Sequence, residues 1–194
     1  MKREHVYKIF SKMPRLETER CILRKISIDD TNDMFEYSQR TDVTEFLTWS
    51  PHRNKAYTLE YLTYIQSRYK TGDFFDWAVI YKETGKMIGT CGFTRFDFLH
   101  DGGEIGYVIN PDYAGQGIAT EVVGRVIRFG FENLSLNRIE CKYIIGNEAS
   151  RRVMDKNGMI FEGVRRKGMC IKGIYRDIGI CSILSEEFFS EKDK

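Results

Sequence analysis

The segment NPDYAGQGIATE, residues 110–121, places Gly115 and Gly117 between an apolar strand-like run and an apolar helix-like run. Glycine loses more backbone freedom on folding than any other residue, so this pair indicates a tight turn or a ligand close to the backbone. The first N–H groups of a helix have no partner within it and lie at the positive end of its dipole. The segment therefore predicts either a site for a phosphate or diphosphate or a plain strand–helix connection.

The donors of this loop are backbone amides, namely those of Gly115, Gln116, Gly117, Ile118, Ala119 and Thr120. The P-loop pattern G-x-x-x-x-G-K-[ST] does not occur in the chain, so kinase or nucleotide hydrolase chemistry has no support. The stretch GQGIAT begins like the dinucleotide-binding pattern G-x-G-x-x-G, but Thr120 stands where the third glycine belongs. No clean strand–helix–strand unit surrounds it, so a nucleotide-binding oxidoreductase is disfavoured.

Apolar periodicity predicts the elements that must position this loop. Strands are predicted at residues 21–26, 76–81, 86–96, 103–109, 138–145, 159–168 and 174–184. Helices are predicted at residues 27–40, 57–70, 118–134 and 147–158. A doubly wound fold would alternate strand and helix throughout, whereas three strands follow one another here before the long helix. The order therefore predicts a mixed α/β or α+β domain.

Composition limits the classes of protein that need to be considered. The chain has 194 residues, 42% of them hydrophobic, so we expect one domain over residues 1–194 with residues 1–14 as a loose extension. A net charge of +2 gives no reason to expect nucleic acid as a partner. Five cysteines without a C-x-x-C pair indicate neither a zinc site nor a disulfide framework. A charged N-terminal segment and the lack of a long apolar run favour a cytoplasmic protein without a membrane partner.

The loop NPDYAGQGIATE resembles the acetyl-CoA pyrophosphate loop of the GNAT superfamily of N-acetyltransferases, whose motif is Q/R-x-x-G-x-G/A. Ala114, Gly117 and Ala119 fall on the first, fourth and sixth positions, and Ala114 departs from the Gln or Arg of the motif. Further blocks, such as WAVIYKETGKMIGTCGF, follow in the order of the branch that includes the ribosomal-protein-alanine N-acetyltransferases. The resemblance implies a mixed, mostly antiparallel twisted sheet of about seven strands with about four helices. It also implies acetyl transfer from acetyl-CoA to a primary amine, without a metal.

The resemblance further implies where acetyl-CoA binds. In the family the pantetheine arm pairs with the strand before the loop, which corresponds here to Val108 and Ile109. Asn147 stands where the family commonly has a hydrogen-bonding partner of the arm. The same asparagine can be the N-cap of the helix that follows, and both roles can hold at once.

Glu104 and Ser150 are the candidates for proton transfer. Glu104 occupies a strand position where the branch often has an acid, and a carboxylate in a partly dry cleft can take the proton of a substrate ammonium. Ser150 stands where the branch often has a serine near the thioester sulfur. An ordinary strand carboxylate and a solvent-facing or back-bonded helix hydroxyl are the alternatives. Many family members place a general-acid tyrosine at the position of Met154, which cannot donate a proton, so Ser150, a water or no group at all would serve the thiolate.

Phe46 and Trp49 fall in the region that covers the acceptor site in the family, and the charge of Asp97 could attract a cationic amine. A small satellite core and a solvated loop are the respective alternatives. The acceptor stays open between a protein N-terminus, an aminoglycoside, a polyamine and another small amine, and so does the choice between monomer and homodimer. Met154 also keeps open a non-catalytic acyl-CoA sensor of the same fold.

Overall fold

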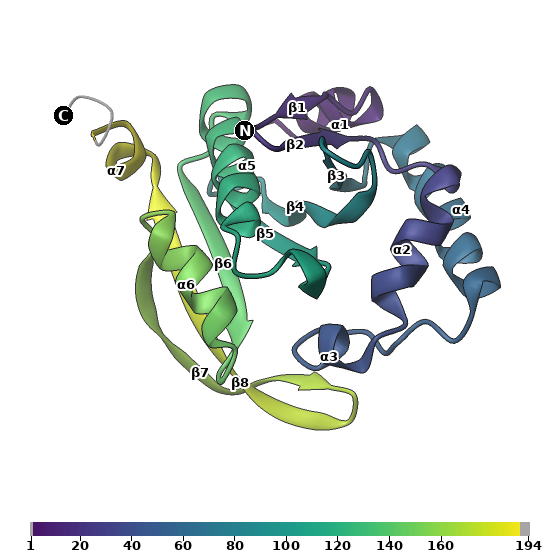
Figure 1. Cartoon of the computed structure of the whole chain (residues 1–194). Coiled ribbons are helices and arrows are strands. Elements are labelled where there is room, and N and C mark those ends of the chain that lie inside the picture. The colour runs from purple at the N-terminus through teal and green to yellow at the C-terminus, as the bar shows by residue number, and fades with distance from the viewer. Residues whose placement is uncertain (1, 191–194) are drawn as a thin grey trace.

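The computed structural model describes residues 2–190, whose strands form a single sheet (Figure 1). The strands are β1 (Leu16–Glu17), β2 (Cys21–Arg24), β3 (Phe75–Tyr81), β4 (Met87–Asp97), β5 (Gly102–Ile109), β6 (Arg138–Ile144), β7 (Ile160–Ile171) and β8 (Ile174–Leu184). Their order in the sheet is β1-β2-β3-β4-β5-β6-β8-β7. Only the β5–β6 pair among these strands is parallel, so the sheet is mixed and mostly antiparallel, as predicted.

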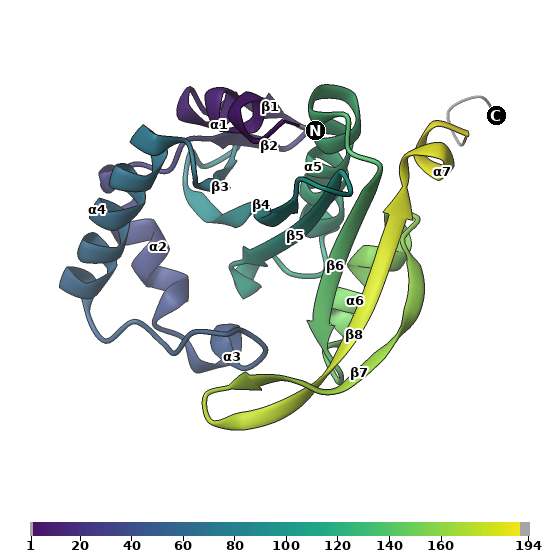
Figure 2. The same cartoon turned by 180° about the vertical axis from the view of Figure 1, so that it is seen from behind.

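Helices cover both faces of the sheet. They are α1 (Arg3–Ser11), α2 (Thr31–Ser38), α3 (Thr41–Thr44), α4 (Lys55–Thr71), α5 (Ile118–Leu134), α6 (Glu148–Lys156) and α7 (Ser185–Ser190), with 3₁₀ turns at Ile28–Asp30 and Pro111–Tyr113. Helices α5 and α6 lie in front of the sheet in Figure 1 and behind it in Figure 2. Trp77 of β3 contacts Phe129 of α5, with ring centroids 5.4 Å apart. Its neighbour Asp76 lies on the opposite face, toward tyrosines of α2 and α4.

The two parallel strands at the centre of the sheet separate partway along their length. Gly102–Ile105 of β5 pairs with Arg138–Cys141 of β6, and the ladder between them ends there. Farther along β5, residues 106–109 remain paired with β4 on their other side. Helix α5 follows β5 and helix α6 follows β6, so both helices begin at the end of the sheet where the strands diverge. The fold therefore brings two helix N-termini to one gap between strands.

Most predicted elements form, and the fold class is as predicted. Helix 118–134 and strand 174–184 have the predicted bounds, and helix 57–70 is longer by three residues at Lys55–Thr71. The described residues contain eight strands and seven α-helices, against about seven strands and four helices expected. The additional elements are the two-residue strand β1 and the helices α1, α3 and α7. All of them are at most nine residues long, so their periodic signals are weak.

The expectation of a loose N-terminal extension is wrong for residues 3–11, which form α1. Val6 and Phe10 lie one helical turn apart and are both fully buried. The Phe10 ring packs 5.2 Å from that of Trp77, and the Trp77 indole donates a hydrogen bond to the carbonyl of Pro14. Burying these two apolar side chains is enough to hold α1 on the sheet, because the charged side chains of the helix stay in water and lose no hydration. Within residues 2–190 no helix has the length and apolar character needed to cross a membrane.

Candidate active site

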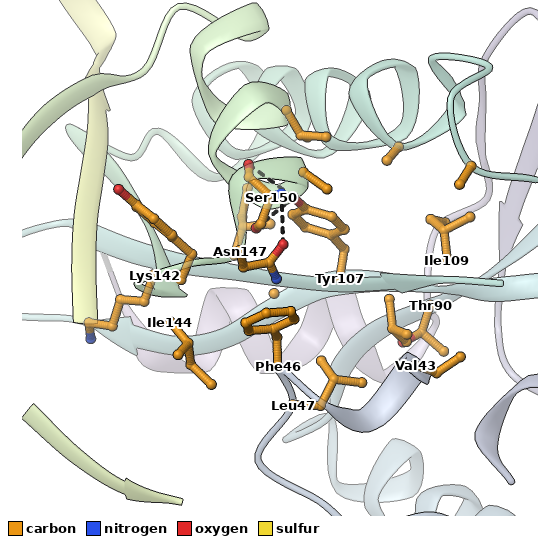
Figure 3. A pocket seen from close by; sticks show the side chains of 18 of the residues that line it. Val43, Phe46, Leu47, Thr90, Tyr107, Ile109, Lys142, Ile144, Asn147 and Ser150 are labelled. Carbon is orange, nitrogen blue, oxygen red and sulfur yellow. Dashed lines mark hydrogen bonds between the residues drawn. The ribbon is translucent and has the colours of Figure 1, made fainter. Parts of the chain in front are cut away.

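A cavity of about 680 Å³ opens where β5 and β6 separate, a size typical of small-molecule sites. Figure 3 shows Tyr107, Asn147 and Ser150 on one side of it and Phe46 and Leu47 on the other. The predicted site residues in its wall are Phe46, Trp49, Glu104, Val108, Ile109, Ala114, Gly115, Gly117, Ile118, Ala119, Thr120, Asn147 and Ser150. The fold thus gathers residues from four separate segments of the chain. Gln116 and Asp97 are the two predicted residues that are not part of this wall.

The backbone of the glycine loop exposes a series of N–H groups, from Gly115 to Thr120, which we call the donor crown. Gly115 and Gly117 have φ angles of +74° and +80°, in the left-handed region that glycine adopts without strain. Gly117 is the N-cap of α5 and contributes no side chain to cap the helix, and Glu121 N–H is the first to bond back to it. The amides from Gly117 to Thr120 therefore have no helical acceptor. A Cβ at Gly115 would meet nothing within 4 Å, so the space above the loop is open.

An arginine that sequence reasoning missed supports this loop from behind. The Arg20 guanidinium donates 2.7 Å hydrogen bonds to the carbonyl of Gln116 and to the carboxylate of Glu121. The ion pair with Arg20 offsets the negative charge of Glu121 in the first turn of α5. Gln116 therefore serves the loop through its backbone, while its side chain is exposed and lies outside the cavity wall.

Two cations from α6 also line the cavity, Arg152 and Lys156. They lie two and six residues beyond Ser150, a spacing that puts them near one another on the helix surface. Their charge favours a ligand that carries phosphate groups. The sequence contained this signal as the run of basic residues that follows Asn147.

The predicted asparagine and serine form one hydrogen-bonded unit at the start of α6. Asn147 is the N-cap, and its side-chain oxygen accepts a 3.1 Å hydrogen bond from the Ser150 amide. The capping alternative for Asn147 is therefore confirmed. The Ser150 hydroxyl lies 2.9 Å from the hydroxyl of Tyr107 on β5 (Figure 3). Met154, at the family's tyrosine position, is buried in the core with 1% exposure and does not line the cavity.

Tyr107 is a cavity residue that the sequence analysis missed. It lies inside an apolar strand, where an aromatic side chain usually packs in the core. Burial raises the pKa of Tyr107 well above its ordinary value, with the hydrogen bond to Ser150 opposing that effect. The phenol therefore keeps its proton at neutral pH and faces the first turn of α6.

Glu104 lines the cavity but is already paired. Its carboxylate accepts a 2.5 Å hydrogen bond from Lys142 Nζ and a 3.1 Å hydrogen bond from the Thr94 hydroxyl. Lys142 also lies 3.2 Å from Glu140, the register partner of Glu104 on β6. The Glu104 side chain is 22% exposed, so the ion pair is partly shielded from solvent. This carboxylate faces the cavity with the ammonium of Lys142 already beside it.

Phe46 and Trp49, which were predicted to cover the acceptor, both line the cavity. Phe46 packs against the apolar cluster of Ile144, Ile171 and Ile178. Lys172, at the tip of the β7–β8 hairpin, donates a hydrogen bond to the carbonyl of Thr44 and thereby ties the hairpin to α3. Trp49 both lines the cavity and packs 5.3 Å from the His52 ring, so it belongs to a satellite aromatic cluster as well.

Asp97 requires a correction, because the structure separates it from the cavity. Its exposed carboxylate accepts hydrogen bonds from the amides of Leu99 and His100 in the β4–β5 turn. Asp97 pairs with Gly102, at the end of β5 opposite Val108 and Ile109. The solvated-loop alternative therefore describes Asp97. Residues 2–190 contain no group of three or more His, Cys, Asp or Glu side chains that could hold a metal ion.

Comparisons with known proteins agree with this arrangement. Residues 20–160 match the family model of the acetyltransferase (GNAT) domain. The uncharacterised N-acetyltransferase p20 of Bacillus licheniformis is 32% identical over 176 residues, covering 91% of this chain and 99% of that protein. A GNAT-family acetyltransferase from Bacillus anthracis has a TM-score of 0.79 at 27% identity, covering 90% of this chain and all of that one.

A solved structure from the branch predicted from the sequence is also similar to this chain. The ribosomal-protein-S5-alanine acetyltransferase of Vibrio fischeri has a TM-score of 0.74 at 27% identity, covering 90% of this chain and 98% of that one. The chain is thus similar to the ribosomal-protein acetyltransferases, as predicted. With the family model matching residues 20–160, the chain belongs to the GNAT family of acetyltransferases.

Proposed function

We propose that this protein transfers the acetyl group of acetyl-CoA directly to a primary amine. The observation that carries the proposal is the meeting of two helix N-termini, those of α5 and α6, at the gap between β5 and β6. A diphosphate fits the first N-terminus, where the positive-φ glycines leave the amides open. The backbone edge of residues 106–109, beyond the end of the β5–β6 ladder, fits an amide-containing arm.

Different residues of the cavity would bind different parts of acetyl-CoA. The amides from Gly115 to Thr120 would hold the diphosphate, and Arg152 and Lys156 add positive charge to the same region. Val108 and Ile109 would pair with the arm, and Asn147, while capping α6, would orient Ser150 near the thioester. When bound, acetyl-CoA supplies an activated acetyl group and a thiol leaving group.

Proton movements would be handled by hydroxyl and carboxyl groups of the chain. As the carbon–sulfur bond breaks, Ser150 donates its proton to the departing sulfur and receives one from Tyr107, whose hydroxyl lies 2.9 Å away. A cavity water returns to Tyr107 the proton that the acceptor nitrogen loses on becoming an amide. Glu104 receives the ammonium proton through a water, because its two oxygens already accept hydrogen bonds from Lys142 and Thr94. A thiol is a good leaving group near neutral pH, so the assistance by Ser150 is modest compared with that of a positioned base.

The acceptor that we propose is the N-terminal amine of a protein. The support is the 27% identity, over 90% of this chain, to an enzyme named for acetylating a ribosomal protein alanine. Phe46 and Trp49 would cover the first side chains of such a substrate. A small-molecule amine, such as a polyamine or an aminoglycoside, is the alternative.

Free thiol release is the measurement that tests this function. The purified chain is mixed with acetyl-CoA and each of four amines: an alanine-initiated peptide, the same peptide with a blocked N-terminus and one lysine, a polyamine and an aminoglycoside. We expect release with the alanine-initiated peptide at the highest kcat/KM. Binding of acetyl-CoA by calorimetry without thiol release for any amine would instead identify a non-catalytic sensor.

A further inference from the structure

A second carboxyl group, Asp76 of β3, faces the same cavity and has no role so far. It was not singled out in the sequence, because an acid between Phe75 and Trp77 looks like the solvent-facing position of a strand. The structure turns it inward, toward α2 and α4. Although the residue as a whole retains some exposure, its Oδ1 is sealed from solvent and has no hydrogen-bond partner among the described residues. A buried carboxyl oxygen without a donor is costly, so it requires an explanation.

Among the described residues, the groups that interact with Asp76 are polar and include no cation. The titratable side chains that interact with it are Tyr37 of α2, Tyr61 and Tyr69 of α4, and Cys91 of β4. All four are neutral at neutral pH, because burial raises each pKa above its ordinary value. Burial also raises the pKa of Asp76 to about 7, and a hydrogen bond from the Thr90 side chain opposes that shift. Asp76 therefore differs from Glu104, which has a lysine beside it.

Two glycines lie between Asp76 and the gap between β5 and β6, and the Thr94 methyl group lies 2.7 Å from the Cβ position of Gly106. Asp76, Gly92 and Gly106 are register partners on three neighbouring strands. A Cβ at Gly92 would come within 2.8 Å of Asp76 Oδ1, so the carboxyl lies over that glycine. Gly106 is the first residue of β5 beyond its ladder with β6. With neighbouring strands about 4.8 Å apart, the backbone of Asp76 lies about 10 Å from that of Gly106, and the carboxyl bridges part of this distance.

We propose that Asp76 binds the protonated nitrogen of the acceptor, so that the site selects cationic primary amines. This inference rests on the proposed acetyl transfer and assigns the acceptor side of the same cavity. An ammonium in the cavity between Asp76 and Glu104, which both line it, has Asp76 on one side and, on the other, the water that leads to Glu104. Asp76 lines the cavity and offers the ammonium a carboxylate, and the sealed Oδ1 gains a donor once the carboxyl turns toward that ammonium. Asp76 thus sets the affinity for the amine, and Glu104 receives its proton.

The test is the KM for the amine in Asp76→Asn, measured with whichever of the four amines the parent acetylates fastest. We expect the KM to rise at least about tenfold, because an amide keeps the shape but cannot pair with an ammonium. With KM expressed as the concentration of the ammonium form, the parent KM should also rise as the pH falls below about 7, where Asp76 gains a proton, and the variant KM should stay constant from pH 6 to 8. The matched control is Asp73→Asn, whose carboxylate pairs with Arg68 outside the cavity and should leave the KM unchanged.

Folding and cofactor binding are checked in the same samples by thermal melting and by calorimetry with acetyl-CoA, and both should be preserved in Asp76→Asn. An amine KM that matches the parent at all pH values would overturn the role of Asp76 while leaving the acetyltransferase proposal standing. A parent that releases no thiol with any of the amines would overturn the proposed function, and with it this inference. A fall in kcat for Asp76→Asn at unchanged KM would also overturn the binding role.

Discussion

The hydroxyl groups of Tyr107 and Ser150 lie 2.9 Å apart and join the middle of the sheet to the first turn of α6. The Ser150 amide is held at the same time by the N-cap oxygen of Asn147. Burial raises the pKa of Tyr107, so its phenol stays protonated at neutral pH. In the proposed mechanism these two hydroxyls act in series, where many family members have a tyrosine at the position of Met154.

The first prediction concerns this pair. Ser150→Ala should lower kcat by about a hundredfold, the lower end of what a positioned acid contributes, with little change in acetyl-CoA affinity. Tyr107→Phe should lower kcat less, because the serine hydroxyl remains. If the two act in series, the double variant should be about as slow as Ser150→Ala alone. Steady-state thiol release gives the rates, and multiplicative effects of the two changes would argue against a relay.

Sequence reasoning predicted those parts of the site whose signal is local. The crown of Gly115 to Thr120 and the pair Asn147 and Ser150 each lie on one turn, where spacing fixes geometry. Tyr107 and Asp76 were missed because each lies in a strand and reaches the cavity only through segments that are far along the chain. The sequence around each residue does not show which face of the sheet carries the cavity. The helix α1 was missed since only Val6 and Phe10 mark its buried face.

Asp97 illustrates a different limit. It is seven residues from Glu104 in the sequence, which suggested a shared strand end. Strands β4 and β5 form a hairpin, and its turn lies at the end of the sheet away from the glycine loop. Sequence proximity indicates a hairpin but does not show which of its ends carries the site.

The second prediction concerns Lys142, which neutralises two neighbouring carboxylates. Glu104 and Glu140 are register partners, so Lys142→Met leaves like charges side by side in a partly buried place. We expect the free energy of unfolding to fall by about 1 kcal/mol at neutral pH. The control Lys82→Met removes a more exposed pair with Glu17 and should cost less. Urea denaturation measures both, and equal losses would show that Lys142 has no special electrostatic role.

The third prediction tests Glu104 as the proton acceptor. Glu104→Gln keeps the shape and removes the charge, so kcat should fall by about two to four orders of magnitude. Acetyl-CoA affinity should hardly change, because the glycine loop lies beyond the other end of β5. The residual rate should rise with pH as more of the amine arrives deprotonated. A near-parental rate at neutral pH, with chemistry shown to limit turnover, would exclude this role.

The fourth prediction tests the donor crown with a matched pair of glycines. Gly117→Glu should abolish acetyl-CoA binding, because it puts a negative charge on the loop that would hold a diphosphate, with its Cβ 3.6 Å from the Arg20 guanidinium. Gly85 has a similar φ of +71° and open space around its Cβ position, but lies in the β3–β4 turn. Gly85→Glu should therefore cost a similar 1–2 kcal/mol, roughly, of left-handed strain and still bind acetyl-CoA. Calorimetry separates the two, and loss of binding in both variants would indicate a general folding defect.

The last prediction turns the burial of Asp76 into a pH-dependent stability. Its pKa is about 7 in the folded chain, against an ordinary value of 3.8. A pKa raised by folding means that the folded state binds the proton more tightly. The stability linked to this group is therefore complete below about pH 3.8 and is lost as the pH rises through about 7.

Asn stays neutral throughout, so Asp76→Asn should be the more stable form at pH 8, by an upper bound of about 4 kcal/mol. The gain should be much smaller at pH 5, where the folded carboxyl is still protonated. Urea denaturation of parent and variant at both pH values tests this. An equal difference at pH 5 and pH 8 would mean that Asp76 is solvated or paired in solution. A pH-dependent gain, found together with a raised amine KM, would identify Asp76 as a group that lowers stability while it serves the acceptor site.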